Sequence, residues 1–326
     1  MRVAVTGATG HLGAATVRDL LAHGFEVRAL HHPQSDLKAL AGLAAGPVAA
    51  DILEPEQLRR AFDGVDAVVH LAGLISIDGD RDGLVARTNV EGARNVAEAC
   101  LAAGVRRLVH ISSIHAFKPS QQLLRLDETA PRADTTCHAY DRSKAAGEDA
   151  VRAVAAKGLD LTILNPTALI GPYDFNLSLT GRMLCQVFAG GVPLVIQGGF
   201  DWIDTRDVAG AIRTALQTDA NGQYLLCGHW VTVSKLTRLC GEASGVRRRR
   251  PAVPWWVASM GVPLELLKSR LAGSPPGYTG ESLAILRDSR DNCCCEKARH
   301  DLGFEARPLA QTISDAHLWY EAEGFI

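Results

Sequence analysis

Tyr140 and Lys144 are the residue pair in this chain best suited to acid–base chemistry. They stand four residues apart in a stretch that predicts a helix over residues 138–156, so the phenol and the ammonium group share one face. An unperturbed tyrosine has a pKa of about 10 and needs a nearby cation to exchange a proton near neutral pH. The pair predicts such a tyrosine, although this spacing also occurs by chance.

Two serines, Ser112 and Ser113, follow an apolar run over residues 107–111 that predicts a buried strand. In a parallel sheet, ligands bind at the edge formed by the carboxyl ends of the strands. A hydroxyl at that edge can hold a substrate oxygen beside Tyr140, and His115 is a further candidate substrate contact. The alternatives are turn formation for the serines and a structural role for the histidine.

Gly7, Gly10 and Gly13 form a G-x-x-G-x-x-G turn after the apolar run at residues 3–5, and a helical pattern follows the turn. Glycines there permit a tight turn and close approach of the backbone to a pyrophosphate, whose charge the helix N-terminus faces. The strand before and the helix after favour a dinucleotide site over an ordinary strand–helix turn.

Strand and helix signals alternate through the first half of the chain. Alternation of this kind predicts right-handed crossovers and a parallel sheet with helices on both faces. The sequence therefore predicts an α/β fold with a doubly wound parallel (Rossmann) sheet. The expected strands are residues 3–5, 26–30, 48–50, 67–71, 107–111 and 161–164, and the expected helices between them include residues 55–62, 89–103 and 138–156.

The second half has shorter elements separated by Pro and Gly, which predicts a small C-terminal α/β cap that binds the substrate. We expect an NAD(P)-binding domain over residues 1–165 plus about 200–228, and a cap over residues 166–199 and 229–326. Residues 255–271 predict an amphipathic helical segment over a pocket, or a surface that touches a membrane.

The composition is that of an ordinary globular protein, with 47% hydrophobic residues, 21% charged residues and a formal net charge of −2. That charge gives no reason to expect nucleic acid binding, and no apolar run is long enough to predict membrane insertion. The basic run Arg247 to Arg250 is expected to be a solvated loop, with binding of an anionic substrate as the alternative.

Eight cysteines, among them the consecutive Cys293, Cys294 and Cys295, show no spacing typical of a metal site. They predict reduced thiols, with the triplet as buried filler. No signal segment stands before the first strand, so we expect a cytoplasmic protein.

A series of motifs occurs in the order found in one enzyme superfamily. The chain resembles the extended short-chain dehydrogenase/reductase superfamily in its NAD-dependent epimerase/dehydratase branch, and most of all dihydroflavonol-reductase-like and 3β-hydroxysteroid-dehydrogenase-like members. The resemblance spans residues 1 to about 215, and it is specific for fold and cofactor class but weak for substrate. The motifs are Thr6 to Gly13, Asp51-Ile52-Leu53, His70 to Gly73, Asn89 to Gly92, Ser112-Ser113, Tyr140 with Lys144, Asn165-Pro166 and Gly171-Pro172.

The resemblance implies a catalytic trio of Ser113, Tyr140 and Lys144, with Ser112 as the alternative serine. Tyr140 would be the acid toward a ketone or the base toward an alcohol. Lys144 would lower the tyrosine's pKa and bind the nicotinamide ribose. Asn89 would be either an ordinary helix cap or a catalytic accessory.

The resemblance also implies two sets of binding residues and no metal site. Asp51 would contact the adenine, and Pro166 would lie near the carboxamide. The expected cofactor-binding residues are Gly7, Thr9, Gly10, His11, Leu12, Gly13, His31, His32, Asp51, Ile52, Leu71, Ala72, Gly73, Asn89, Tyr140, Lys144 and Pro166. The expected substrate-binding residues are Leu74, Ser113, His115, Tyr140 and Asn176.

The second expected strand ends in His31-His32-Pro33, which bears on the choice between NAD and NADP. A site selective for NAD would place an acid about 20 residues after the glycines. No acid stands there, and His32, Ser35 and Lys38 could receive a 2′-phosphate, while Arg28 lies in mid-strand. We therefore favour NADP, with NAD as the alternative.

The sequence favours an NAD(P)-dependent oxidoreductase that interconverts a ketone and a secondary alcohol on a fairly apolar small molecule. Its pocket should lie among residues 74–78, His115, residues 173–180 and residues 255–278, which are largely apolar or aromatic. The alternatives are a nucleotide-sugar epimerase with tightly bound NAD and a non-catalytic NAD(P)-sensing protein. Arg182, Arg206 or the basic run would serve a diphosphate in an epimerase.

Two expected helices, over residues 89–103 and 138–156, are rich in alanine on faces that the catalytic trio does not need. In the superfamily that the chain resembles, such helices form a four-helix dimer contact. The resemblance therefore implies a homodimer.

Overall fold

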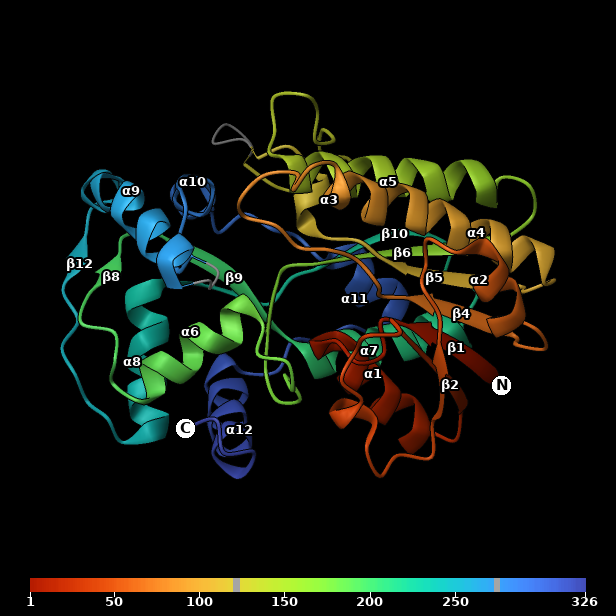
Figure 1. Ribbon diagram of the computed structural model, residues 1–326, viewed down its shortest axis with the longest axis horizontal. Coiled ribbons are helices and arrows are strands. Elements are labelled where there is room, and N and C mark those ends of the chain that lie inside the picture. Colours follow the sequence, from red (N-terminus) through yellow and green to blue (C-terminus); the bar gives the residue numbers. More distant parts are fainter. Residues whose placement is uncertain (120–123, 273–275) are drawn as a thin grey trace.

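The computed structural model of the protein describes residues 1–119, 124–272 and 276–326 (Figure 1). A large α/β lobe lies at the right in Figure 1 and a smaller cap lies at the left. The long helices of the large lobe cover both faces of its sheet, which is the layering expected from the alternating sequence pattern.

Seven strands form the sheet of the large lobe. They are β1 (Arg2–Thr6), β2 (Glu26–His31), β3 (Gly46–Ala49), β4 (Ala67–His70), β5 (Arg107–Ile111), β6 (Asp160–Pro166) and β10 (Gly222–Leu226). Their order is β10-β6-β5-β4-β1-β2-β3, and every neighbouring pair is parallel. The strand order reverses between β1 and β4, where a doubly wound sheet opens a crevice for a ligand. The expected doubly wound fold is confirmed.

The helices of the large lobe divide between the two faces of the sheet. One face carries α1 (His11–Ala22), α7 (Thr205–Gln217) and α11 (Glu296–Leu302), and the other carries α2 (Pro55–Ala61), α4 (Gly92–Ala102) and α5 (Ala139–Ala155). Val3 and Val5 pack in the core on the α1 side, while Ala4 packs on the α4 side. Successive side chains of a strand point to opposite faces, so β1 is apolar throughout.

Short elements join these strands and helices. They are η1 (Lys38–Leu40), α3 (Leu84–Ala86), the π-helical turn η2 (Arg87–Glu91) and η3 (Ile114–Ala116). Several alanines of α4 that suggested a dimer contact, such as Ala93 and Ala97, lie in the core against the sheet. The homodimer stays a prediction.

The cap is built on two small sheets and its own apolar core. One sheet has the order β11-β9-β7 and the other pairs β12 with β8. The core includes Phe188, Trp202 and Tyr320. The cap strands are β7 (Ala168–Ile170), β8 (Val195–Ile196), β9 (Gly199–Asp204), β11 (His229–Thr232) and β12 (Ala252–Val253). The cap helices are α6 (Leu179–Phe188), α8 (Val233–Ser244), α9 (Trp255–Ala272), α10 (Gly280–Asp288) and α12 (Leu309–Ala322).

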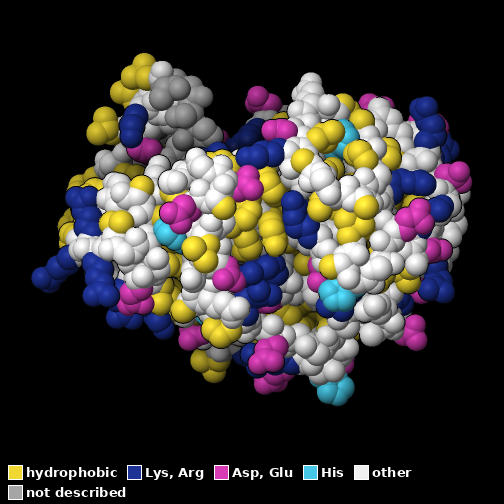
Figure 2. Space-filling view, turned by 90° about the horizontal axis from the view of Figure 1, so that it is seen from below, with side chains coloured by type: hydrophobic (Ala, Val, Ile, Leu, Met, Phe, Trp, Pro, Cys, Tyr) yellow, Lys and Arg dark blue, Asp and Glu magenta, His cyan; other side chains and the backbone are white. Residues whose placement is uncertain are grey.

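The chain crosses between the two lobes more than once. β9 pairs within the cap, whereas α11 packs through Ala298 and Leu302 into the core of the large lobe. Seen from below, hydrophobic side chains gather in the middle of the molecule, where the cap meets the large lobe (Figure 2). The division of the chain into two domains at the expected residues stays a prediction.

The expectation of eight reduced thiols is wrong for two of them. Cys227, just after β10, and Cys293 form a disulfide across 66 residues of sequence. The backbone of the triplet also pairs with residue 126, because Cys294 N donates to Leu126 O at 2.9 Å. The disulfide therefore joins the segment before α11 to the edge of the central sheet.

Candidate active site

The glycine turn between β1 and α1 is shaped for close approach. Gly7 has φ +68°, and a Cβ there would lie 2.8 Å from Ala72 N. A Cβ on Gly13 would overlap the backbone of Gly7 and Ala8, while Gly10 N donates to Gly7 O at 3.0 Å. Side chains at Gly7 and Gly13 are excluded, and the N-terminus of α1 stays open to a pyrophosphate.

Thr6 fixes the end of β1 against the end of β4. Its hydroxyl accepts from Leu71 N and Ala72 N, both at 3.2 Å, and lies 2.8 Å from His70 Nδ1. Burial lowers the pKa of His70 to about 3, so its ring is neutral and can accept the threonine proton. These bonds hold the backbone of residues 71–73 beside the glycine turn, as a cofactor site on this edge requires.

The cap loop after β7 closes over the glycine turn. Asn176 Nδ2 donates to Thr9 O at 3.0 Å, and His11 Nε2 lies 3.1 Å from Pro172 O. Asn176 therefore ties the cap to the cofactor turn, and its contact with substrate stays a prediction. Sequence reasoning missed this link because the partners lie 167 residues apart.

The three residues predicted to be catalytic come together at the carboxyl end of β5. Tyr140 and Lys144 project from α5, and Ser113 follows β5 by two residues. The Ser113 hydroxyl lies close enough to the Tyr140 phenol to lower its pKa, and Lys144 Nζ donates to Ile111 O at 3.3 Å. The predicted convergence of helix and strand end is present.

Burial governs the ionisation of the trio. Burial raises the pKa of Tyr140 above its ordinary value, the Ser113 bond lowers it, and the Asp141 carboxylate raises it. Burial lowers the pKa of Lys144 to about 8, against an opposing effect of Glu148. At neutral pH the phenol is therefore protonated and the ammonium remains mostly charged.

Asn89 does not cap a helix, so the capping alternative is wrong; its side chain instead cross-links the loop after β4 to α5. It lies inside η2, and its Nδ2 donates to Leu74 O and to Ser143 Oγ, both at 2.9 Å. Its Oδ1 accepts from Leu74 N at 2.8 Å. A Cβ on Gly73 would lie 3.1 Å from Asn89 Oδ1 and 3.7 Å from Lys144 Nζ. Asn89 thus fixes the loop after β4 beside the lysine.

The residues present fit a nicotinamide dinucleotide. The glycine turn leaves open the cradle that a Cβ would fill, and Gly73 leaves the same kind of space beside Lys144. Leu71 and Ala72 offer their backbone between these two points, and the buried Pro166 ends β6 on the same edge. We therefore expect the predicted cofactor-binding residues at this edge to hold the pyrophosphate and the nicotinamide half of the dinucleotide.

A buried network of polar side chains on α5, β6 and β10 lies next to the three residues predicted to be catalytic, and sequence reasoning missed it. Glu148 is fully buried on α5 and accepts hydrogen bonds from Asn165 Nδ2 at 2.7 Å and Gln223 Nε2 at 3.0 Å. Asn165 Nδ2 also donates to Ser113 O at 2.8 Å. Arg132 and Arg152 lie 2.6 and 3.8 Å from Glu148, so the buried carboxylate is paired. The network fixes the backbone that carries Ser113.

His115 has a partner that the sequence did not reveal. Its Nδ1 lies 2.7 Å from Asp141 Oδ1, and its ring packs edge-on to Tyr140 at 5.5 Å between centroids. An ionised carboxylate only accepts hydrogen bonds, so Nδ1 carries the proton in this contact. Asp141 is buried beside Tyr140, and His115 supplies it with a hydrogen-bond partner.

The end of β2 holds the residues expected to distinguish NAD from NADP. His31 is buried, whereas His32 is 52% exposed and its Nε2 lies 3.7 Å from Asp51 Oδ2. Gln34 N donates to His32 Nδ1 at 3.3 Å, so Nε2 carries the proton and can donate. Lys38 is paired with Glu323 at 3.0 Å. Each basic residue therefore has an acidic neighbour, and His32 has the longer contact of the two.

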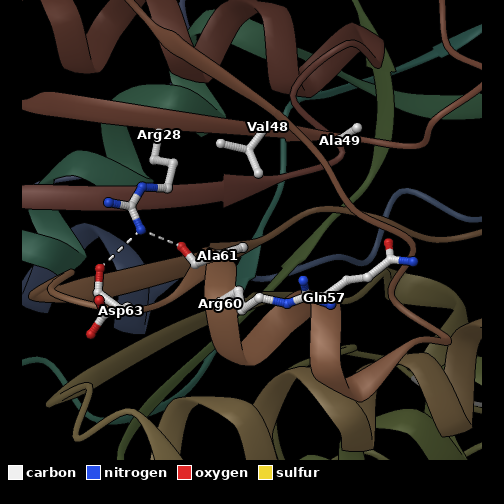
Figure 3. Close-up of a pocket in the computed structure, with 7 residues that line it drawn as sticks. All are labelled: Arg28, Val48, Ala49, Gln57, Arg60, Ala61 and Asp63. Carbon is white, nitrogen blue, oxygen red and sulfur yellow. Dashed lines mark hydrogen bonds between the residues drawn. The ribbon is translucent and has the colours of Figure 1, made fainter.

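Arg28 points away from the carboxyl edge of the sheet. Its guanidinium donates to Ala61 O at 2.6 Å and Asp63 O at 2.9 Å, at the C-terminal end of α2 (Figure 3). Arg28 and Arg60 line a pocket there of about 490 Å³. None of the residues that line this pocket belongs to the predicted cofactor-binding or substrate-binding residues.

Ile52 and Leu12 support the cofactor edge through packing. Ile52 packs so closely on Gly92 of α4 that a Cβ on Gly92 would collide with the Ile52 side chain. Leu12, in the first turn of α1, lies in the core. Asp51 Oδ1 accepts from Leu53 N at 2.9 Å, which orients its carboxylate. No group of three or more potential metal ligands occurs within the described ranges, and no described helix is long and apolar enough to cross a membrane.

Comparison with known proteins assigns the class. The model of the NAD dependent epimerase/dehydratase family matches residues 3–228, so the chain belongs to that family. It is an enzyme of the NAD(P)-dependent reductase or epimerase type.

Three similar proteins illustrate the range of this class. The chain is 34% identical to sterol demethylase protein B of Methylococcus capsulatus over the whole of both chains. It is 30% identical to 4-hydroxy-2-methyl-3-oxo-4-farnesyl-3,4-dihydroquinoline-1-oxide ketoreductase of Stigmatella aurantiaca, over 97% of this chain and 95% of the other. The structure of UDP-glucose 4-epimerase of Thermotoga maritima has a TM-score of 0.82 at 19% identity, covers 99% of both chains and shares the fold.

Proposed function

We propose that the protein is an NAD(P)-dependent oxidoreductase that interconverts a ketone and a secondary alcohol on a fairly apolar small molecule. The observation that carries this proposal is the convergence of Ser113, Tyr140 and Lys144 at one sheet edge. When bound, the nicotinamide supplies or accepts the hydride. The protein must then move one proton at the neighbouring oxygen.

Tyr140 is the group that moves this proton. Its raised pKa keeps the phenol protonated at neutral pH, which is the form that can donate to the oxygen of a ketone. Ser113 holds that oxygen by a second hydrogen bond. The Lys144 ammonium stabilises the phenolate left behind, because opposite charges in a buried site attract strongly.

The apolar character of the substrate is supported from two sides. Exposed apolar side chains such as Ile75 and Leu84 flank the loop after β4, next to the trio. One relative is named for a sterol and another for a farnesylated ring ketone. A ring-shaped, apolar ketone or alcohol is the substrate class that fits both.

NADP is the favoured cofactor. No acid stands at the end of β2, and His32 Nε2 can donate to a 2′-phosphate. His32→Asp should shift the preference toward NAD, because the carboxylate repels the phosphate and can accept from a ribose hydroxyl. The measurement is kcat/KM with NADPH and with NADH. An unchanged ratio would count against His32 as the selecting residue.

The function is tested by a screen of ketones and secondary alcohols for oxidation of NADPH or reduction of NADP. We expect turnover with cyclic apolar ketones and little with small polar ones. Failure of every carbonyl and alcohol, with the cofactor properly bound, would contradict the proposal and favour the sensing alternative.

The epimerase alternative requires free cations in the cap for a diphosphate. Arg206 is paired with Asp204 and Asp315, while Arg248 and Arg250 donate to backbone carbonyls in the last turn of α6 and in the segment after it. Only part of the expected cation set is thus available. Purified protein that retains NAD and shows no net NADPH oxidation would favour the epimerase.

A further inference from the structure

Helix α9 presents a continuous apolar stripe on the outside of the cap. Trp256, Met260, Leu264, Leu267 and Leu271 are 53–81% exposed. At about 100° per residue, their spacing places them within an arc of about 80°. With Trp255, α9 supplies six of the sixteen large apolar side chains that are exposed among the described residues. Patches of this kind mark interaction surfaces.

The opposite side of α9 is the side that packs on the cap. Ala258 is buried, and a Cβ on Gly261 would lie 2.5 Å from the Tyr278 hydroxyl. Glu265 Oε1 accepts from Gly277 N at 2.8 Å. These contacts fix the inner face of the helix, and the described part of the chain leaves the α9 stripe on the outer face uncovered.

The sequence around the α9 stripe is strongly basic. Residues 247–272 contain five arginines and one lysine against a single acid, Glu265, in a chain whose net charge is −2. Arg247, Arg249 and Lys268 are exposed, whereas Glu265 is engaged by Gly277. Lys268 stands on α9 four residues after Leu264, so a cation lies beside the apolar stripe, and the basic run Arg247 to Arg250 precedes the helix in the sequence. An apolar helix face with adjoining positive charge is an arrangement that binds anionic lipid surfaces.

We propose that the α9 stripe docks on the surface of an anionic lipid bilayer, with α9 lying in the interfacial plane. The apolar side chains would enter the boundary between headgroups and acyl chains, and the neighbouring cations would meet lipid phosphates. A second copy of the chain fits the stripe less well, because a two-fold contact would bring the same cations together.

The docked helix adjoins the candidate active site. Thr279, which caps α10 next to α9, donates to Ile77 O at 2.6 Å in the loop after β4. An apolar substrate would therefore reach the site from the bilayer side. This last consequence rests on the proposed function, whereas the docking itself does not.

The test is flotation of the full chain with vesicles of phosphatidylcholine, alone or mixed with phosphatidylglycerol, without substrate or cofactor. We expect association with the anionic vesicles that weakens in high salt. The double variant Leu264→Asp, Leu267→Asp should reduce this association at least about tenfold, because two leucine side chains that would be buried in the bilayer are lost. Leu318→Asp on α12, where Leu318 is 59% exposed, is the matched control and should bind like the wild type.

A second measurement needs no change in charge. Brominated phospholipid should quench the tryptophan fluorescence of the wild type, and Trp256→Phe should reduce the quenching. Absence of wild-type association with anionic vesicles, or equal association of the double variant, would overturn the proposal. A fall in molecular mass of the double variant by light scattering would also overturn it and assign the stripe to a contact between copies.

Discussion

The two lobes treat their apolar and polar groups in opposite ways. In the large lobe, β1 is apolar on both faces and covered on both, and the polar residues Thr6 and Asn165 at the carboxyl edge are held by hydrogen bonds to neighbouring strand ends. In the cap, α9 packs one side on its neighbours and exposes an apolar stripe on the other. The large lobe holds the residues of the candidate active site in fixed positions, while the cap leaves an apolar surface free for a partner.

The serines after β5 give the sharpest kinetic test of the fixed edge. Ser113→Ala should lower kcat by about 10²-fold, since it removes one donor to the reacting oxygen and the bond to Tyr140. Ser112 is the matched control, because its buried hydroxyl has no hydrogen-bond partner among the described residues. Ser112→Ala should leave kcat nearly unchanged. Equal losses in the two variants would remove the distinction between the serines.

Paired truncations of leucine separate the covered lobe from the open helix. Leu20→Ala on α1 removes a fully buried side chain and should lower the free energy of unfolding by about 2–5 kcal/mol. Leu264→Ala on α9, where the leucine is 71% exposed, should change it by no more than about 0.5 kcal/mol. Denaturant unfolding measures both. A large loss at Leu264 would show that the α9 stripe is covered in solution.

The pH dependence of kcat/KM should report the ionisation of Lys144 at the carboxyl edge of the large lobe. Lys144 is charged below its pKa of about 8 and loses its proton as the pH rises through that value. Its help in stabilising the Tyr140 phenolate is then lost, so kcat/KM for ketone reduction should fall above about pH 8. Lys144→Met should abolish this fall along with most of the activity. A flat profile to high pH would contradict the role of the lysine.

The large lobe was predictable because its signals are local. Each strand and helix carries its own pattern, and Tyr140, Lys144 and the glycines of the turn stand at fixed short spacings. Parallel order then follows from the connections, which bring the strand ends to one edge. The same logic places the serine pair Ser112-Ser113 near Tyr140, and the resemblance to the superfamily selects Ser113.

The features that were missed depend on long-range pairing. Cys227 and Cys293 lie 66 residues apart, and nothing in the spacing of the triplet selects one cysteine. Gln223 reaches Glu148 across 75 residues, so neither residue signals the buried network alone. The partner of Asn89 is likewise distant, since Ser143 stands 54 residues away. Periodicity reveals which face of a helix is apolar, but not whether the fold covers it.

Replacement of Tyr140 tests the central claim most directly. The measurement is the rate of NADPH oxidation with a ketone substrate, alongside the affinity for the cofactor, in the wild type and in Tyr140→Phe. Loss of the proton donor should lower kcat by about 10²–10⁴-fold, with cofactor affinity close to that of the wild type. A Tyr140→Phe enzyme that reduces the ketone at the wild-type rate would contradict the account.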